Sequence, residues 1–165
     1  TFLAFLIFTL PTYSNEEIKN DDFNEHEFSV YSGMFDFSDD GQRAALVGVQ
    51  HHNELLQRDS IFGTLSPITG FIYTENNASY FYTGIQTQYK LGNINVIPSF
   101  TPGIYDQGDG KDLGHALEFK SEVQLSFDIF SNSELGFSYN HISNASLGDK
   151  NPGANSYMFN FIKSF

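Results

Sequence analysis

A histidine and a serine separated by one residue stand near the end of the chain, in the segment YNHISNASLGDKNPGANSY at 139–157. A serine hydroxyl becomes a nucleophile when an imidazole accepts its proton and a third group fixes the tautomer of that imidazole. His141 and Ser143 could supply the first two groups, and the side chain of Asn144 or nearby backbone amides could stabilise an oxyanion. The alternative is a polar loop in which histidine and serine bond to each other. Spacing alone favours that alternative, because H-x-S is a common chance pattern.

The element that shows most clearly how such residues are positioned spans 112–130. Even positions there carry charges, and odd positions are mostly apolar. The odd positions are Leu113, His115, Leu117, Phe119, Ser121, Val123, Leu125, Phe127 and Ile129. A period of two indicates a β-strand, and this one is longer than the roughly 5–6 residues typical of globular sheets. Glu118, Lys120 and Glu122 share the polar face and could pair across a narrow lumen, which favours a membrane barrel over a soluble sandwich.

The rest of the chain divides into similar segments at its turn signals. The predicted strands span 27–37, 43–52, 60–74, 78–91, 94–105, 112–130, 133–144 and 155–165. Eighteen Phe and nine Tyr in a chain that is only 40% hydrophobic suit a wall with lipid outside and a polar lumen inside. Long connections at 106–111 and 144–154 alternate with tight ones at 92–93 and 131–133, and the last strand ends in Phe165. These features predict an all-β fold, an eight-stranded antiparallel transmembrane β-barrel of the bacterial outer membrane.

The two ends of the chain predict how it is organised. Residues 1–14 are predicted to be a partial signal peptide, because their apolar run is too short to span a bilayer and small residues follow it. A buried N-terminal helix is the alternative. Residues 15–26 are predicted to be an acidic periplasmic leader and 27–165 the barrel. A net charge of −12 argues against nucleic acid and anionic lipid as partners, and without cysteine the fold has no disulfides.

Strand parity predicts where the polar candidates point. We take 133–144 and 155–165 as neighbouring antiparallel strands. On each strand the outward face is apolar in the middle and continues toward the connecting loop with polar residues. The residues on these two outward faces are Leu135, Phe137, Tyr139, His141 and Ser143, and Asn155, Tyr157, Phe159 and Phe161. Asn155 is therefore expected near His141 and Ser143 on the outer surface. Polar side chains that face lipid are costly unless they pair or reach headgroups, so their position argues for a functional use.

The run HISNASLGDKNPG, its preceding FxYxH strand and the upstream segment GDGKDLGHALEFKSE carry a family resemblance. Over residues 60–165 the chain resembles the PagL-type lipid A 3-O-deacylases. The resemblance implies an outer-membrane esterase that removes the acyl chain ester-linked at position 3 of lipid A, at the external leaflet and without a cofactor or metal. In this comparison His141 matches the general base and Ser143 the nucleophile.

Other positions follow from the same resemblance. Asn144 matches an asparagine implicated in oxyanion stabilisation, and Asn151 matches a loop asparagine that supports it. Asn155 stands where the family pattern has a glutamate that orients the histidine. An amide oxygen can still accept the imidazole N–H, although it stabilises imidazolium less than a carboxylate does, so reduced turnover is expected. The predicted substrate-facing surface consists of Phe119, Tyr139 and Tyr157.

Other functions and sites stay open at this point. The expected partners are lipopolysaccharide and outer-membrane lipid, and the chain could act as a monomer or a homodimer. The competing classes are a non-catalytic barrel, either structural or an inactive relative that binds lipid A, and a secreted β-sandwich. DQGDGKD at 106–112 resembles a calcium loop only loosely, and an acidic turn is the better interpretation. His51 and His52 are adjacent and would point to opposite faces of a strand, so no two-histidine metal site is expected.

Overall fold

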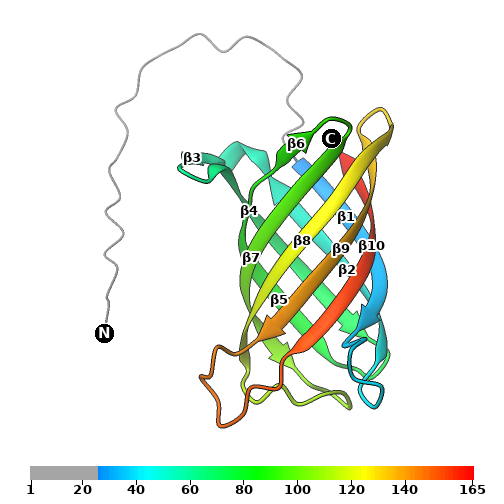
Figure 1. The fold of residues 1–165 in the computed structure, drawn as a ribbon, viewed down its shortest axis with the longest axis vertical. Coiled ribbons are helices and arrows are strands. Elements are labelled where there is room, and N and C mark those ends of the chain that lie inside the picture. Colours follow the sequence, from blue (N-terminus) through cyan, green and yellow to red (C-terminus); the bar gives the residue numbers. More distant parts are fainter. Residues whose placement is uncertain (1–25) are drawn as a thin grey trace.

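The computed structural model describes residues 26–165, which form a closed antiparallel β-barrel (Figure 1). The wall strands are β1 (His26–Phe35), β2 (Ala44–Asn53), β4 (Gly63–Thr74), β5 (Ser79–Gln86), β7 (Ile94–Asp106), β8 (Leu117–Phe130), β9 (Ser133–Ser143) and β10 (Ala154–Ser164). Each pairs with the next along the chain, and β1 pairs with β10 to close the wall. The predicted eight-stranded barrel is confirmed. The predicted signal peptide and all of the predicted leader except His26 lie outside the described residues, and His26 is the first residue of β1.

Three short elements lie between the wall strands: the 3-10 helix η1 (Glu54–Leu56), β3 (Arg58–Ser60) and β6 (Tyr89–Leu91). The predicted strand 78–91 is therefore two strands, both of which pair with β7. The break lies opposite Pro98 of β7, which has no N–H to continue the ladder. Across residues 26–165 the structure contains no helix that is long and apolar enough to span a membrane.

The predicted strand 112–130 begins later than expected, at Leu117. Residues 107–116 form a loop that crosses the neighbouring loop 144–153 closely. At the crossing Gly114 has a φ of +94°, and a Cβ there would lie 2.3 Å from the carbonyl oxygen of Lys150. Leu113 consequently turns into the core, where it is 1% exposed, instead of facing lipid. From Leu117 to Phe127 the predicted alternation of outward and inward side chains holds, but Asp128 is exposed, where the register with β9 shifts.

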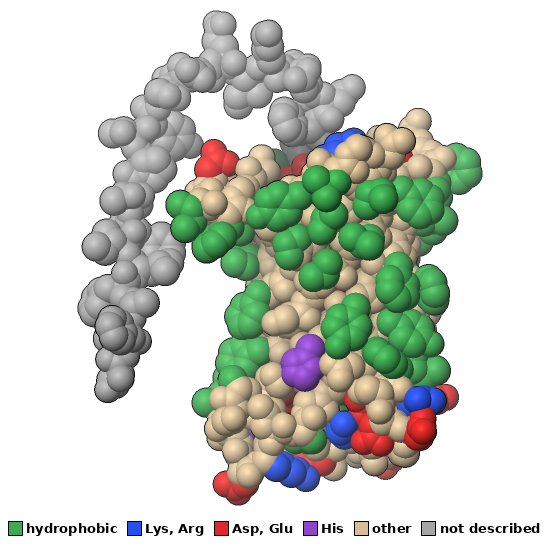
Figure 2. Space-filling model, in the orientation of Figure 1, with side chains coloured by type: hydrophobic (Ala, Val, Ile, Leu, Met, Phe, Trp, Pro, Cys, Tyr) green, Lys and Arg blue, Asp and Glu red, His purple; other side chains and the backbone are tan. Residues whose placement is uncertain are grey.

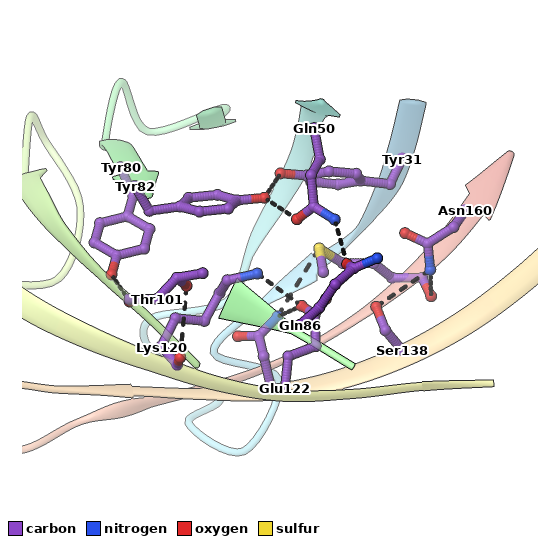
Figure 3. Close-up of polar contacts among 12 residues, drawn as sticks. Tyr31, Gln50, Tyr80, Tyr82, Gln86, Thr101, Lys120, Glu122, Ser138 and Asn160 are labelled. Atoms are coloured by element: carbon purple, nitrogen blue, oxygen red, sulfur yellow. Dashed lines mark hydrogen bonds and ion pairs between the residues drawn. The ribbon is translucent and has the colours of Figure 1, made fainter. Parts of the chain in front are cut away.

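Polar side chains fill the middle of the lumen (Figure 3). Lys120 Nζ donates to Glu122 Oε2 at 3.0 Å, and the amide of Asn140 donates to the same oxygen at 3.3 Å. The predicted pairing of lumen charges is right for Lys120 and Glu122. It is wrong for Glu118, whose buried carboxyl oxygens have no hydrogen-bond partner within residues 26–165. A filled lumen makes this barrel a packed core and not a channel.

The outer wall and the two rims of the barrel differ in composition. Figure 2 shows hydrophobic side chains over the wall that faces the viewer and charged side chains gathered toward the two ends. We call one rim the loop end, which carries the loops 36–43, 75–78, 107–116 and 144–153. The opposite rim, the terminal end, carries the start of β1, the end of β10 and the connections 54–62, 87–93 and 131–132. In Figure 1 the loop end lies at the bottom.

Candidate active site

The predicted base and nucleophile lie on the outer surface, where β9 reaches the loop end. The side chain of His141 is exposed and that of Ser143 is partly exposed, whereas Ile142 between them is fully buried. Asn155 is the second residue of β10 and pairs directly with His141 across the two strands. Residues directly opposite in an antiparallel pair carry their side chains on the same face. The local alternation of β9 and β10 thus brings the imidazole and the amide together.

A directed series of hydrogen bonds fixes the imidazole of His141. Its Nδ1 lies 2.8 Å from Asn155 Oδ1, and the Asn155 amide nitrogen lies 3.1 Å from the Ser38 hydroxyl, which in turn lies 3.4 Å from Asp36 Oδ1. A hydroxyl has one proton to donate. Ser38 donates that proton to the Asp36 carboxylate, so its oxygen accepts a hydrogen bond from the amide nitrogen of Asn155. The amide oxygen of Asn155 therefore faces His141. His141 then donates from Nδ1, which leaves Nε2 unprotonated and able to accept a proton.

Asp36 anchors this series from behind. It is 1% exposed, forms an ion pair with Lys111 at 2.5 Å, and accepts a hydrogen bond from the backbone N–H of Asn155 at 3.3 Å. The backbone of Phe37 also donates to the Asn155 carbonyl at 2.9 Å. The loop 36–43 therefore holds Asn155 through its backbone as well as its side chain, which limits how far the amide can move away from His141.

The free Nε2 of His141 points toward the loop end. Ala154 pairs with Ile142, so Gly153 comes next at the level of Ser143. A Cβ on Gly153 would lie 2.8 Å from His141 Cε1 and 3.3 Å from Nε2, and the Gly153 φ is +62°. The Cε1–Nε2 edge of the ring therefore lies against Gly153, at the loop end. Within residues 26–165 no hydrogen bond joins the Ser143 hydroxyl to the imidazole. Such contacts often tighten only when substrate is bound.

Asn144 and Asn151 hold the loops beside Ser143. Asn144 is fully buried, and its amide nitrogen donates to the carbonyls of Leu113 and Lys150, both at 2.8 Å. Its amide oxygen accepts from the Ser146 backbone at 2.9 Å, and its own backbone N–H donates to Asn151 Oδ1 at 3.0 Å. Both protons of the Asn144 side chain are thus engaged. In this arrangement the two asparagines support the loop, and the Asn144 side chain has no donor left for an oxyanion.

Aromatic rings flank the site on both sides. Phe119 of β8 pairs with Ser143 and stacks on Phe100 of β7, with ring centroids 6.0 Å apart. On the other side Tyr139 and Tyr157 are cross-strand partners, and Phe37 packs on both at 6.1 Å and 5.5 Å. Tyr139 also donates its hydroxyl to Asn155 Oδ1 at 2.9 Å. The structure therefore places all three residues of the predicted substrate-facing surface beside the imidazole and the serine.

Comparison with known proteins agrees with this geometry. The family model described as lipid A 3-O-deacylase (PagL) matches residues 47–164. The chain belongs to the PagL family. No curated protein matches it.

Solved structures show how widely this PagL-family fold occurs. The crystal structure of the outer membrane enzyme PagL aligns with a TM-score of 0.63 and 17% identity, covering 84% of this chain and 99% of that one. A de novo designed transmembrane β-barrel aligns with a TM-score of 0.56 and 8% identity, covering 84% of this chain and 95% of the designed one. Neisserial surface protein A aligns with a TM-score of 0.51 and 10% identity, covering 85% of this chain and 96% of that protein. At these identities the likeness concerns the fold.

Two residues of this PagL-family site were missed from the sequence, Asp36 and Ser38. Asp36 was assigned to the strand 27–37, at a position where the alternation points outward. A charged residue at a lipid-facing position of a predicted strand is unusual, and this could have drawn attention to Asp36. Ser38 carried no signal, since its role depends on how the loop 36–43 folds back onto β10.

The acidic stretch 106–112 does not form a common site in this PagL-family barrel. Asp106 caps the Gly108 N–H at 2.9 Å, Asp109 accepts from Asn77 at 2.8 Å, and Asp112 forms an ion pair with Lys150 at 2.7 Å. The hydrogen bond from Lys150 is the main reason that the pKa of Asp112 lies below its usual value. Each carboxylate has a separate partner, as expected for an acidic turn, and the pair with Lys150 ties the loop 107–116 to the loop 144–153.

Proposed function

We propose that this chain is an outer-membrane serine esterase that hydrolyses the acyl ester at position 3 of lipid A. The observation that carries the proposal is the 2.8 Å contact between His141 Nδ1 and Asn155 Oδ1, on the outer wall beside Ser143. The contact leaves Nε2 as the base, on the side where Ser143 lies. Membership of a family described as lipid A 3-O-deacylases supplies the substrate class.

The reaction follows from these groups. Ser143 Oγ attacks the ester carbonyl carbon while His141 Nε2 accepts the hydroxyl proton. As the tetrahedral intermediate collapses, the imidazolium gives that proton to the departing sugar oxygen, and the acyl group stays on Ser143. A water molecule, deprotonated by the same Nε2, then attacks the acyl-enzyme. As this second intermediate collapses, the imidazolium returns the proton to Ser143 Oγ, so the products are 3-deacylated lipid A, the fatty acid and free Ser143. Throughout, Asn155 accepts the hydrogen bond from His141 Nδ1–H, and Asp36 supports Asn155 through Ser38.

The oxyanion is proposed to be held by the backbone N–H of Ala145, in the loop after Ser143. The N–H of Ala145 has no acceptor within residues 26–165. Ala145 and Ser146 have φ values of 52° and 65°, a conformation that L-residues rarely adopt. Strained backbone of this kind clusters at active sites, where surrounding contacts maintain it. Asn144 and Asn151 are those contacts, so their proposed contribution is to shape the loop.

The position of the site suits an ester at a membrane surface. The wall below His141 presents apolar side chains to lipid, whereas the loops beyond Ser143 carry charges. Lipid A carries its acyl esters where headgroup meets hydrocarbon. We propose that the loop end faces the exterior and that an acyl chain lies along Phe119, Tyr139 and Tyr157.

The test is mass spectrometry of lipid A from bacteria that express the chain. Wild-type protein should yield lipid A lighter by one hydroxyacyl group, and Ser143→Ala should abolish the change. Ser121→Ala is the matched control, because Ser121 is exposed on the outer wall and pairs with His141 from β8. That variant should retain activity. Heat-modifiable migration on gels reports whether each variant is folded.

Two outcomes would contradict the proposal at different points. Unchanged lipid A with folded wild-type protein would favour a non-catalytic barrel. Activity that survives Ser143→Ala but is lost in Ser121→Ala would keep the reaction and reassign the nucleophile.

A further inference from the structure

Three ligand-type side chains meet inside the barrel at the terminal end, on the opposite rim from the candidate active site. They are Glu27, His52 and Glu54, and one nitrogen or oxygen atom of each lies within 4.8 Å of those of the other two. Strand geometry explains the meeting. Glu27 of β1 pairs directly with His52 of β2, and Glu54 follows two residues after His52 on the same face. Asn53 caps η1 by accepting the Leu55 N–H at 3.0 Å, which holds Glu54 in place.

His52 is buried without the hydrogen bonds that a buried imidazole needs. It is 5% exposed, and neither Nδ1 nor Nε2 has a hydrogen-bond partner within residues 26–165. Buried polar atoms are nearly always paired, and an unpaired one costs free energy. The adjacent His51 is different, because its Nε2 lies 3.0 Å from His26 Nδ1. Of the two adjacent histidines, His52 is therefore the one that lacks partners, and its side chain is directed into the cluster.

The distances suit ligands around one cation better than direct pairing. His52 Nδ1 lies 3.6 Å from Glu27 Oε1 and 3.9 Å from Glu54 Oε1, too far for hydrogen bonds. A divalent transition metal binds nitrogen and oxygen at about 2.0–2.2 Å, so ligands at tetrahedral angles are roughly 3.3–3.6 Å apart. The His52 nitrogen and the Glu27 oxygen fit that separation, and a small movement of Glu54 brings its oxygen to the same distance.

The electrostatics also favour a cation. Two carboxylates and one imidazole meet within a few ångströms. Lys90 is the cationic side chain lining the adjoining polar cavity of about 320 Å³, which also borders His52, Glu54 and Gln57. Among the ion pairs within residues 26–165, Lys90 pairs with neither glutamate. The cavity leaves room for a water ligand on the metal.

We propose that Glu27, His52 and Glu54 form a binding site for a divalent transition-metal ion of the Zn²⁺ type, which crosslinks β1, β2 and η1 at the terminal end. Imidazole with carboxylates selects such metals over Ca²⁺ and Mg²⁺, which prefer all-oxygen sites. Three protein ligands leave a fourth tetrahedral position for water. The inference is independent of the esterase proposal. Taken as a pair of ligands, His51 and His52 predict no metal site from the sequence. The proposed site uses His52 alone, with partners from another strand and from η1.

The test is Zn²⁺ binding to the full chain, folded in detergent without a histidine tag, measured by competition with a chromophoric chelator. Wild-type protein should bind one Zn²⁺ per barrel, and Zn²⁺ should raise the temperature at which heat-modifiable migration is lost. His52→Gln and Glu54→Gln should each weaken binding about tenfold or more, since removal of even an outer-shell partner costs metal sites that much. Glu54→Gln changes a partly exposed residue outside the wall strands, so it tests the site with little risk to folding.

Matched controls separate this cluster from the other histidines. His51→Gln and His26→Gln remove the outward pair, and His115→Gln removes a histidine at the loop end; none should change the affinity. Absence of saturable binding by folded wild-type barrel would overturn the proposal. Binding lost in His51→Gln and kept in His52→Gln would overturn it as well, by assigning the metal to the outward pair.

Discussion

At the level of single residues, the candidate site combines an amide with a more distant carboxylate. Asn155 contacts His141 directly, and Asp36 lies two hydrogen bonds behind Asn155, through Ser38. A carboxylate that acts through an amide and a hydroxyl can fix the imidazole tautomer. It stabilises imidazolium less than direct contact would, because the electrostatic interaction weakens with distance.

Asn155 should limit turnover through its contact with His141. Asn155→Ala removes the acceptor of Nδ1–H, and a lost hydrogen bond of about 1–3 kcal/mol corresponds to turnover lower by roughly 5- to 150-fold. Asn155→Glu should retain activity and raise turnover, because a charge-assisted hydrogen bond is about twice as strong as a neutral one. Ester hydrolysis by purified variants at equal folded concentration measures both effects. If Asn155→Ala equals wild type, the orienting group lies elsewhere, and Asp149 is the next residue to change.

Gly153 should be required by the imidazole as well as by the backbone. In Gly153→Ala the new Cβ would lie 2.8 Å from His141 Cε1, so the ring must shift, and a shift of about 1 Å can lower turnover about 100-fold. Gly92→Ala is the matched control, since Gly92 has a φ of +63° against +62° for Gly153 and nothing lies within 4 Å of its Cβ position. Both variants should lose roughly 1–2 kcal/mol of stability from the backbone. Equal turnover in the two variants would show that the contact with His141 is unimportant.

At the level of elements, the site depends on the alternation of the wall strands. β9 sends Tyr139 and His141 outward and Asn140 and Ile142 inward, and β8 alternates in the same way from Leu117 to Phe127. A shift of one residue in register would exchange the two faces. The position of the base on the lipid side is therefore a consequence of the same pattern that fills the lumen.

Charge substitutions on β8 should reveal this alternation as a difference in stability. Val123 is 49% exposed on the wall, and Gln124 is 7% exposed and faces the lumen. Val123→Arg should destabilise the barrel in bilayers by about 2–4 kcal/mol. Gln124→Arg should cost less, because the buried acids Glu118 and Glu122 outnumber Lys120. Unfolding titrations with denaturant in lipid vesicles give both values, and equal losses would be inconsistent with the assigned faces.

At the level of the whole molecule, closure of the barrel brings the first and the last wall strands together beside the site. The pairing of β1 with β10 places the loop 36–43 against residue 155, so that Asp36 and Asn155 meet although 119 residues separate them. Closure also removes free strand edges, as a barrel in lipid requires. At the other rim, the pairing of β1 with β2 assembles Glu27, His52 and Glu54.

Orientation in the membrane can be tested because the chain lacks cysteine. A single cysteine at Leu147, which is exposed in the loop 144–153, should react in intact cells with a thiol reagent that does not cross membranes. A single cysteine at Ser131, in an exposed turn of the terminal end, should react only after lysis. The proposed orientation places the loop end outside. The reverse labelling pattern would place the site at the periplasmic surface, away from the external leaflet.

The sequence by itself determined the strands, their faces and the outward position of His141, Ser143 and Asn155, because alternation is a local property that each strand carries in its own residues. It also indicated the turns and the family. It misplaced the start of β8, since only the packing of Gly114 against Lys150 shows that Leu113 belongs to a loop. Tertiary structure decided the partners: Asp36 and Ser38 behind Asn155, Gly153 against His141, and Glu27 beside His52. These contacts join different strands or loops, and they depend on the register of paired strands, which no single segment encodes.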